Sequence, residues 1–204
     1  MSQLALMPGI APSYDSDASQ WFTPPDLAHR LVRWCGSIMP KRVLEPSAGS
    51  GALIDAWINA RKQNAWQLDA VELDEDWVGH LSDRYADEQR VTVIHDDFLT
   101  RRAEQYDFAL LNPPYEDGKA RRFLRTCMYR SEKVCGIFQT SILQGVENVE
   151  SIWNDESWTW MIALLKRRPK FSGASGSAQR DFCCVKGRRT DPGERRAVKL
   201  EWWS

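Results

Sequence analysis

The chain has 204 residues, a formal net charge of −1 at pH 7 and a hydrophobic content of 43%. A chain of this length fits one α/β domain with a substantial core. No apolar run approaches the ~20 residues that a membrane-spanning helix needs. No basic region followed by an apolar stretch marks an export signal at the N-terminus. We therefore expect one globular domain without a membrane anchor.

The cysteine pattern argues against a disulfide framework and against a zinc site. There are five cysteines, an odd number, and none has C-x-x-C spacing. Cys183 and Cys184 are adjacent in an expected strand, so their side chains should point to opposite faces and serve packing. We therefore expect a reducing cytosol. The small size of the chain further suggests a bacterial or phage-infected cell.

Residues 1–19 contain Ser, Asp and Pro without periodicity, and we expect a flexible leader there. Pro24 and Pro25 can begin a helix, and apolar residues recur on one face through residues 25–38. The remaining chain alternates between strand and helix patterns, which favours a largely parallel sheet with helices on both faces. The expected strand–helix pairs span about 41–64, 67–86, 91–104 and 106–131, followed by a strand at 133–138, a short helix at 145–154 and strands at 158–165 and 182–186.

A glycine-rich turn follows the first expected strand. Residues 42–46 form a short apolar run that ends in Glu45 and Pro46, and residues 47–51 read Ser-Ala-Gly-Ser-Gly before a helical segment. Strand, glycine-rich turn and helix form the first unit of a nucleotide-binding α/β fold. The spacing is neither G-x-G-x-x-G nor a P-loop, so a pyrophosphate cradle is the weaker interpretation.

Acidic residues stand at the ends of the next two strands. Glu72 ends the second strand, and an ionised carboxylate can accept both hydroxyl protons of a ribose. Asp97 and Phe98 follow the third strand, where they offer a carboxylate to an adenine amine and a ring to its face. Each acid alone is typical of a strand-end loop. Three strand ends in order, each with a suitable polar group, indicate a nucleoside-binding edge.

Residues 112–115 read Asn-Pro-Pro-Tyr and directly follow the apolar run 108–111. The side-chain oxygen of Asn112 and the carbonyl of Pro113 can both accept hydrogen bonds from one exocyclic amine. Because proline fixes φ, these acceptors are held in place before a substrate arrives. The ring of Tyr115 can stack on a planar base. The tetrapeptide predicts a pocket for a flat group that carries an NH2, although alone it also fits a proline-rich turn.

Together these motifs resemble the class I S-adenosylmethionine-dependent methyltransferases of the N6-adenine DNA type. The resemblance covers about residues 20–188, and residues 21–27 match an extra cofactor motif placed before the glycine loop, as in the gamma-like order. It implies a Rossmann-like α/β fold: a seven-stranded, mostly parallel sheet with helices on both faces and the last strand antiparallel. It implies S-adenosyl-L-methionine as cofactor, no metal, and direct in-line methyl transfer to a flipped base.

The resemblance also implies a role for each matching residue. The catalytic residues would be Asn112, Pro113, Pro114 and Tyr115. The cofactor-binding residues would be Thr23, Glu45, Pro46, Ala48, Gly49, Gly51, Glu72, Leu73, Asp97, Phe98 and Asn112. Tyr115 and Phe171, the latter in the late segment 169–173, would hold the flipped base. Sequence position adds two further expectations: Arg121 and Arg122, on the helix after the catalytic motif, would contact the nucleic acid, and Trp21, beside the cofactor motif, could wall the cofactor pocket.

Charge is distributed unevenly along the chain. Residues 1–118 contain 10 Lys and Arg against 19 Asp and Glu, whereas residues 119–204 contain 17 against 9. A protein of nearly neutral net charge can still present a basic face to phosphate, although any single cluster equally fits a solvated face. The candidates are Lys119, Arg121, Arg122, Arg125, Arg130, Lys166, Arg167, Arg168, Lys170, Lys186, Arg188 and Arg189.

The expected domain organisation leaves little chain for sequence recognition. We expect a leader at 1–19, a catalytic domain at 20–188 and a C-terminal tail at 189–204. Reading base edges requires side chains placed in a groove. We therefore expect a short or lax recognition sequence, a recognition subunit or homodimer, or an RNA substrate.

Three interpretations remain. The favoured one is methyl transfer to the N6 amine of adenine in duplex or single-stranded DNA. The second is a methyltransferase of RNA adenine or of a protein glutamine amide, because both present a planar NH2; the basic second half favours nucleic acid over protein. The third is a non-catalytic partner subunit, against which the retained Asn112, Tyr115, Glu72 and Asp97 argue.

Overall fold

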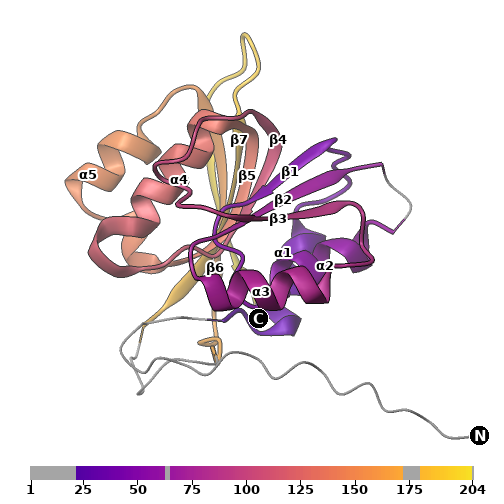
Figure 1. Cartoon of the computed structure of the whole chain (residues 1–204). Helices are drawn as coiled ribbons and strands as arrows, with labels where there is room; N and C mark the ends of the chain where they lie inside the picture. Colours follow the sequence, from indigo (N-terminus) through magenta and orange to yellow (C-terminus); the bar gives the residue numbers. More distant parts are fainter. Residues whose placement is uncertain (1–21, 63–64, 172–179, 204) are drawn as a thin grey trace, which may run out of the picture.

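The computed structural model describes residues 22–62, 65–171 and 180–203. They form an eight-stranded sheet in the order β3-β2-β1-β4-β5-β7-β6-β8, with α1, α2 and α3 on one side and α4 and α5 on the other (Figure 1). The strands are β1 Arg42–Glu45, β2 Gln67–Glu72, β3 Val91–His95, β4 Tyr106–Leu111, β5 Ser131–Gln139, β6 Trp158–Leu165, β7 Phe182–Arg189 and β8 Val198–Trp203. The helices are α1 Pro25–Trp34, α2 Ala52–Ala60, α3 Glu75–Arg84, α4 Lys119–Arg130 and α5 Val146–Asn148.

Strands β1 to β5 are parallel to one another. The antiparallel strand is β7, which pairs with β5 and β6, and not the last strand β8, which is parallel to β6. The strand order reverses between β1 and β4, and ligands of such sheets bind at the carboxyl ends of the strands beside this reversal. Glu45 ends β1, and Asn112 directly follows β4. The fold therefore brings the glycine-loop acid and the Asn-Pro-Pro-Tyr motif to one edge of the sheet.

The core has two layers because strand side chains alternate between the two faces of the sheet. Leu110 packs with α1 and α2, whereas Ala109 and Leu111 pack with α4. Cys184 belongs to the first layer and Cys183 to the second, which confirms that the two cysteines point to opposite faces. All five cysteines are free thiols.

Helix α1 begins as the sequence indicates but ends earlier than expected. Pro25 occupies the first turn, and Leu27, Ala28, Leu31 and Val32 form the buried stripe. The helix stops at Trp34 rather than near residue 38, because Gly36 adopts a left-handed conformation with φ of 77° that no α-helix can continue.

Two further expectations are corrected. The sheet has eight strands rather than seven, since β8 pairs with β6 in parallel and takes up residues expected to form the tail. No helix follows β3 in residues 96–105. There the Asp97 carboxylate accepts a bond from the Leu99 amide, and the Arg130 guanidinium holds the carbonyls of Phe98 and Arg101. These bonds fix a compact turn that leads directly into β4.

The short helix expected at 145–154 is α5 followed by a π-helical turn, Val149–Trp153. Trp153 donates its indole N–H to the carbonyl of Ile142 at 2.8 Å, which ties this segment to the turn after β5. The Trp153 ring also packs edge-on against Trp160 of β6, with ring centroids 5.1 Å apart. Among the described residues, no helix has the length and apolar character required to cross a membrane. The expected leader, residues 1–19, lies outside the described residues.

Candidate nucleoside and amine site

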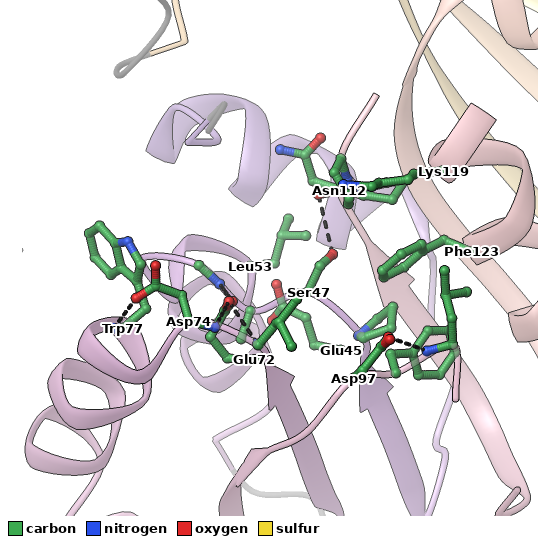
Figure 2. Close-up of a pocket in the computed structure, with 18 of the residues that line it drawn as sticks. Glu45, Ser47, Leu53, Glu72, Asp74, Trp77, Asp97, Asn112, Lys119 and Phe123 are labelled. Carbon is green, nitrogen blue, oxygen red and sulfur yellow. Dashed lines mark hydrogen bonds between the residues drawn. The ribbon is translucent and has the colours of Figure 1, made fainter. Parts of the chain in front are cut away.

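A cavity of about 700 Å³ opens at the carboxyl ends of β1, β2, β3 and β4. Its volume is typical of a pocket for a small organic ligand. Figure 2 shows Glu72, Asp74 and Trp77 on one side, Glu45 and Ser47 in the middle, and Asn112, Lys119 and Phe123 on the other. The sequence-predicted residues that line it are Thr23, Glu45, Pro46, Ala48, Gly49, Glu72, Leu73, Asp97, Phe98, Asn112, Pro113, Pro114, Tyr115 and Arg122.

The glycine loop owes its shape to backbone bonds and to one close contact. The Ala48 amide donates to the carbonyl of Val71 at 3.0 Å, which ties the loop to β2. Gly51 has φ of 80°, and a Cβ at this position would overlap the hydroxyl of Tyr85. That hydroxyl donates to the Gly51 carbonyl at 3.0 Å and lies 2.9 Å from the Asp55 carboxylate. Gly51 is thus buried behind the loop and does not line the cavity. The expectation that Gly51 contacts the cofactor is therefore not supported by its position.

Glu72 at the end of β2 is held by three backbone amides. Its Oε2 accepts from Gly49 at 2.7 Å, and its Oε1 accepts from Leu73 at 2.9 Å and from Asp74 at 3.0 Å. A carboxylate offers about four lone-pair sites. With three sites taken, the carboxylate has about one site left to accept a hydrogen bond from a ligand hydroxyl. It could bind both hydroxyls of a ribose only if one of the three hydrogen bonds from the backbone amides were broken.

Glu45 is a buried carboxylate that faces the cavity. The residue is 2% exposed, and its Oε2 has no hydrogen-bond partner among the described residues. Burial raises the pKa of Glu45 well above its usual value, and the nearby carboxylates of Glu72 and Asp55 add to this shift. A cationic group in the cavity would supply the partner that this oxygen lacks.

Asp97 and Phe98 form the third wall. The Asp97 Oδ1 accepts from the Leu99 amide at 2.9 Å. The ring of Phe98 lies 5.3 Å from that of Phe123 and 4.9 Å from the guanidinium carbon of Arg130. Phe98 is 2% exposed, so its ring is a fixed wall of the cavity and not an open platform.

The side chain of Asn112 is bonded at both ends. Its Nδ2 donates to the hydroxyl of Thr23 at 2.9 Å, and its Oδ1 accepts a hydrogen bond from the hydroxyl of Tyr115. The same hydroxyl lies 3.3 Å from the carbonyl of Ile137. Burial raises the pKa of Tyr115, so the phenol stays protonated and remains a donor. The acceptor oxygen is therefore oriented, but a substrate amine would have to replace the phenol.

Three aromatic rings lie beside this asparagine. The rings of Tyr115 and Phe182 meet edge-on at 5.6 Å, and those of Phe171 and Phe182 are 4.7 Å apart. Phe171, 56 positions after Tyr115 in the chain, is thus brought to the Asn-Pro-Pro-Tyr motif through Phe182. Phe171 does not line the cavity, and residues 172–179 lie outside the described part.

The basic residues of α4 separate into different roles. Lys119 and Arg122 line the cavity, and neither forms an ion pair within the described residues. Arg121 pairs with Glu147. Arg130 is 6% exposed and structural, so the expectation that it belongs to a basic face is wrong.

Lys186 of β7 is also structural: its ammonium donates to the carbonyl of Trp34 at 2.8 Å.

Several lining residues were not singled out from the sequence. Trp77 packs against Phe22 with ring centroids 4.7 Å apart, and together they close the cavity beside Gly49. The sequence did offer a signal for the role of Trp77, because this residue lies in the first turn of the helix that follows Glu72 at the end of β2. Trp21, which we expected at this wall, lies outside the described residues. Other lining residues are Ser47, Ser50, Asp74, Asp96, Leu99, Thr100 and Phe123.

Comparison with known proteins supplies partial matches. No protein-family model matches the chain. The modification methylase CviBIII of Paramecium bursaria Chlorella virus NC1A is 36% identical over 73 residues, which cover 36% of this chain and 19% of that protein. The tRNA1(Val) (adenine(37)-N6)-methyltransferase of Tolumonas auensis is 36% identical over 88 residues, which cover 42% of this chain and 37% of that protein. The matches thus span well under half of the length of either relative.

A solved structure matches most of the fold. The methyltransferase subunit of a type I restriction-modification system from Streptococcus thermophilus superimposes with a TM-score of 0.70 at 13% identity, over 91% of this chain and 48% of that one. The chain therefore has the Rossmann-like fold of class I methyltransferases, and methyltransferases of this fold use S-adenosylmethionine.

Proposed function

We propose that this protein transfers a methyl group from S-adenosylmethionine to the exocyclic N6 amine of adenine in DNA. The observation that carries the proposal is the placement of Asn112 and Tyr115 beside a cavity of nucleoside size, whose other walls carry Glu45, Glu72 and Asp97. The first two residues suit a planar amine, and the three acids suit a cationic nucleoside. The position of Thr23 ahead of the glycine loop fits the gamma-like motif order.

The residues that are present fit this cofactor. Glu72 would accept a ribose hydroxyl at its remaining lone-pair site, and Asp97 would accept from the adenine amine. Glu45, whose Oε2 is buried without a partner, would face the positively charged amino-acid end. When bound, S-adenosylmethionine supplies an electrophilic methyl group for direct displacement.

The proposed mechanism rests on two acceptors. An adenine amine is a poor nucleophile because its lone pair is delocalised into the ring. The side-chain oxygen of Asn112 and the carbonyl of Pro113 would each accept a hydrogen bond from one N–H of the amine. These two bonds favour a pyramidal nitrogen whose lone pair is available for attack on the methyl group. After transfer the methylated ammonium is acidic enough to lose one proton to water. Holding the amine in this position supplies much of the rate.

Substrate entry requires one change at the site. The Tyr115 hydroxyl occupies the Asn112 oxygen, so the incoming amine must replace that phenol. A ring released in this way could stack on the flipped base, at about 1–3 kcal/mol per base. This stacking would offset the few kcal/mol that unpairing and unstacking cost.

RNA is the second candidate substrate, and one observation favours it. The matched tRNA methyltransferase acts on adenine 37 and is as similar to this chain as the modification methylase. Both substrates offer the same amine and the same phosphates, and Lys119 and Arg122 at the cavity would suit either. We place the reaction in the cytosol of a bacterial or phage-infected cell, where both substrates are accessible.

Tritium transfer from labelled S-adenosylmethionine tests the proposal with duplex DNA, single-stranded DNA and total RNA in parallel. Label recovered as N6-methyldeoxyadenosine supports the DNA reaction. Label in RNA alone moves the protein to the second candidate. Cofactor binding without label in any nucleic acid contradicts the proposal and points to a protein amide or to a non-catalytic subunit.

A further inference from the structure

Strand β8 is an edge of the sheet, and within the described residues no strand pairs with its outer side. Its apolar residues Val198, Leu200 and Trp202 are 49%, 57% and 61% exposed. Because side chains alternate along a strand, these three share one face, while Lys199 and Glu201 share the other. An exposed apolar edge is a template for pairing with another strand, and monomeric proteins normally blunt it.

Two hydrogen bonds fix which backbone groups face outward. The amide of Trp160 donates to the carbonyl of Ala197 at 2.8 Å, and the amide of Lys166 donates to that of Trp203 at 2.9 Å. Residues two apart on a strand present their N–H and C=O to the same side. The odd-numbered residues of β8 therefore bond to β6, and the outward groups belong to Val198, Leu200 and Trp202.

We propose that β8 pairs antiparallel with β8 of a second copy of this chain, about a two-fold axis at Leu200. In this register Leu200 lies opposite Leu200 of the second copy, and Val198 lies opposite Trp202 of the second copy. These are the outward-facing residues of both strands, so the N–H and C=O of each find a partner. The two-fold contact is closed, as in most homodimers.

The charges of the strand select the same register. With the axis at Leu200, Lys199 faces Glu201 of the second copy, and Glu201 faces Lys199 of the second copy. Moving the axis by one residue would set Lys199 opposite Lys199 or Glu201 opposite Glu201, which destabilises a pair. Neither residue forms an ion pair within the described part of the chain. Lys199 lies close enough to Glu194 to add to the lowering of the Glu194 pKa, which comes mainly from Arg188. The indole of Trp203 donates to Oε1 of Glu201 at 2.8 Å and orients its carboxylate.

The apolar face is continuous across the axis. Val198, Leu200 and Trp202 of both copies would form one strip, with an aromatic ring opposite a β-branched side chain at each end, a favourable cross-strand pair. Trp203 stays on the other face, where it packs edge-on against Trp34 with ring centroids 5.0 Å apart. One short strand makes a small interface, so we expect a reversible dimer that depends on protein concentration.

Two complementary variants test the register. Lys199→Glu makes the edge acidic at both positions, and Glu201→Lys makes it basic at both. We expect sedimentation velocity to show the wild type dimerising with concentration and each variant dimerising at least about tenfold more weakly, since two cross-strand pairs become repulsive. An equimolar mixture of the two variants should restore dimers, because each acidic edge then faces a basic one.

Arg33→Glu is the matched control for Lys199→Glu, since it makes the same charge change on an exposed face of α1 and should dimerise like the wild type. Circular dichroism of each variant checks the fold. A wild type that stays monomeric at every concentration overturns the proposal, as do single variants that dimerise normally or a mixture that does not recover. Neither cofactor nor nucleic acid is present, so the result is independent of the proposed reaction.

Discussion

The side-chain amide of Asn112 donates to the hydroxyl of Thr23 at 2.9 Å, joining two residues that lie 89 positions apart. This bond orients the amide, because the nitrogen is committed to Thr23 and the oxygen then faces Tyr115. The segment before α1 and the turn after β4 therefore form one unit. Its geometry supports the proposed acceptor role of Asn112.

Replacing Asn112 with Ala should abolish methyl transfer and leave cofactor binding within a few-fold of the wild type. The substitution removes the amine acceptor, whereas the proposed cofactor contacts at Glu45, Glu72 and Asp97 remain. Isothermal titration with S-adenosylmethionine and a transfer assay on the same sample separate the two effects. Thr23→Val is the informative partner: it keeps Asn112 but removes the bond that orients it, so an intermediate turnover is expected. Near-normal turnover of Asn112→Ala would contradict the mechanism.

Glu72→Ala should mainly weaken cofactor binding. The carboxylate accepts three backbone amides and has about one site left for a ribose hydroxyl, so its loss removes a ligand contact and loosens the glycine loop. We expect about a tenfold or larger rise in the dissociation constant, corresponding to one hydrogen bond to a charged group. The control is Asp69→Ala on the same strand, which lies away from the cavity. An unchanged dissociation constant for Glu72→Ala would remove Glu72 from the proposed site.

Glu45→Gln should stabilise the cofactor-free protein and weaken cofactor binding. The pKa of Glu45 is raised in the folded state. The folded protein therefore binds this proton more tightly than the unfolded chain, and the resulting stabilisation is complete below the usual pKa near 4.5 and is lost as the pH rises through the raised pKa. Glutamine carries no such penalty. The gain in melting temperature over the wild type should therefore grow between pH 5 and pH 8, as scanning fluorimetry can measure. A gain that is absent or falls with pH would contradict the burial of a charge-bearing carboxylate.

Gly51→Ala should cost about 2 kcal/mol or more, since it combines a left-handed backbone with an overlap on the Tyr85 hydroxyl. Adding Tyr85→Phe removes the overlapping atom and should recover part of this loss. Gly79→Ala is the matched control: it lies within α3 with nothing near its Cβ and should stabilise by up to about 1 kcal/mol. Urea unfolding of the four proteins provides the comparison. Equal effects of the two glycine substitutions would refute the conformational argument.

Arg122→Gln should weaken nucleic-acid binding without affecting the fold. Arg122 is exposed at the start of α4 and lines the cavity, where a phosphate contact would release about one counterion. The slope of log affinity against log salt should fall by about 1 in magnitude. Arg33→Gln on α1 should leave the slope unchanged. Equal slopes for Arg122→Gln and the wild type would exclude a phosphate contact at this position.

Local patterns predicted most of the elements that build the site. Strand β6 was expected at residues 158–165 and is observed there, because eight largely apolar residues between polar turns admit few other structures. The strand ends that carry Glu45, Glu72, Asp97 and Asn112 followed from the same pattern and from the rule that ligands bind at carboxyl ends. These residues now line one cavity.

The features that the sequence did not predict depend on contacts between residues far apart in the chain. The turn after β3 is fixed by Arg130, which lies 29 and 32 positions from its two carbonyl partners. A signal for its burial was available, since Arg130 falls on the helical stripe of Phe123 and Cys127. β8 alternates apolar and polar residues, but its pairing with β6 is set by tertiary structure. The bond between Tyr115 and Asn112 likewise has no sequence signature.

The most direct test of the proposed reaction is methyl transfer to a random-sequence DNA library. A second library carries the unsubstituted base purine in place of every adenine. Purine keeps the ring but lacks the exocyclic amine. Mass spectrometry of digested nucleosides should find N6-methyldeoxyadenosine from the first library, no methylated purine from the second, and no product from either with Asn112→Ala. Equal transfer to both libraries, or a product methylated elsewhere on adenine, would contradict the proposal that Asn112 presents an adenine amine.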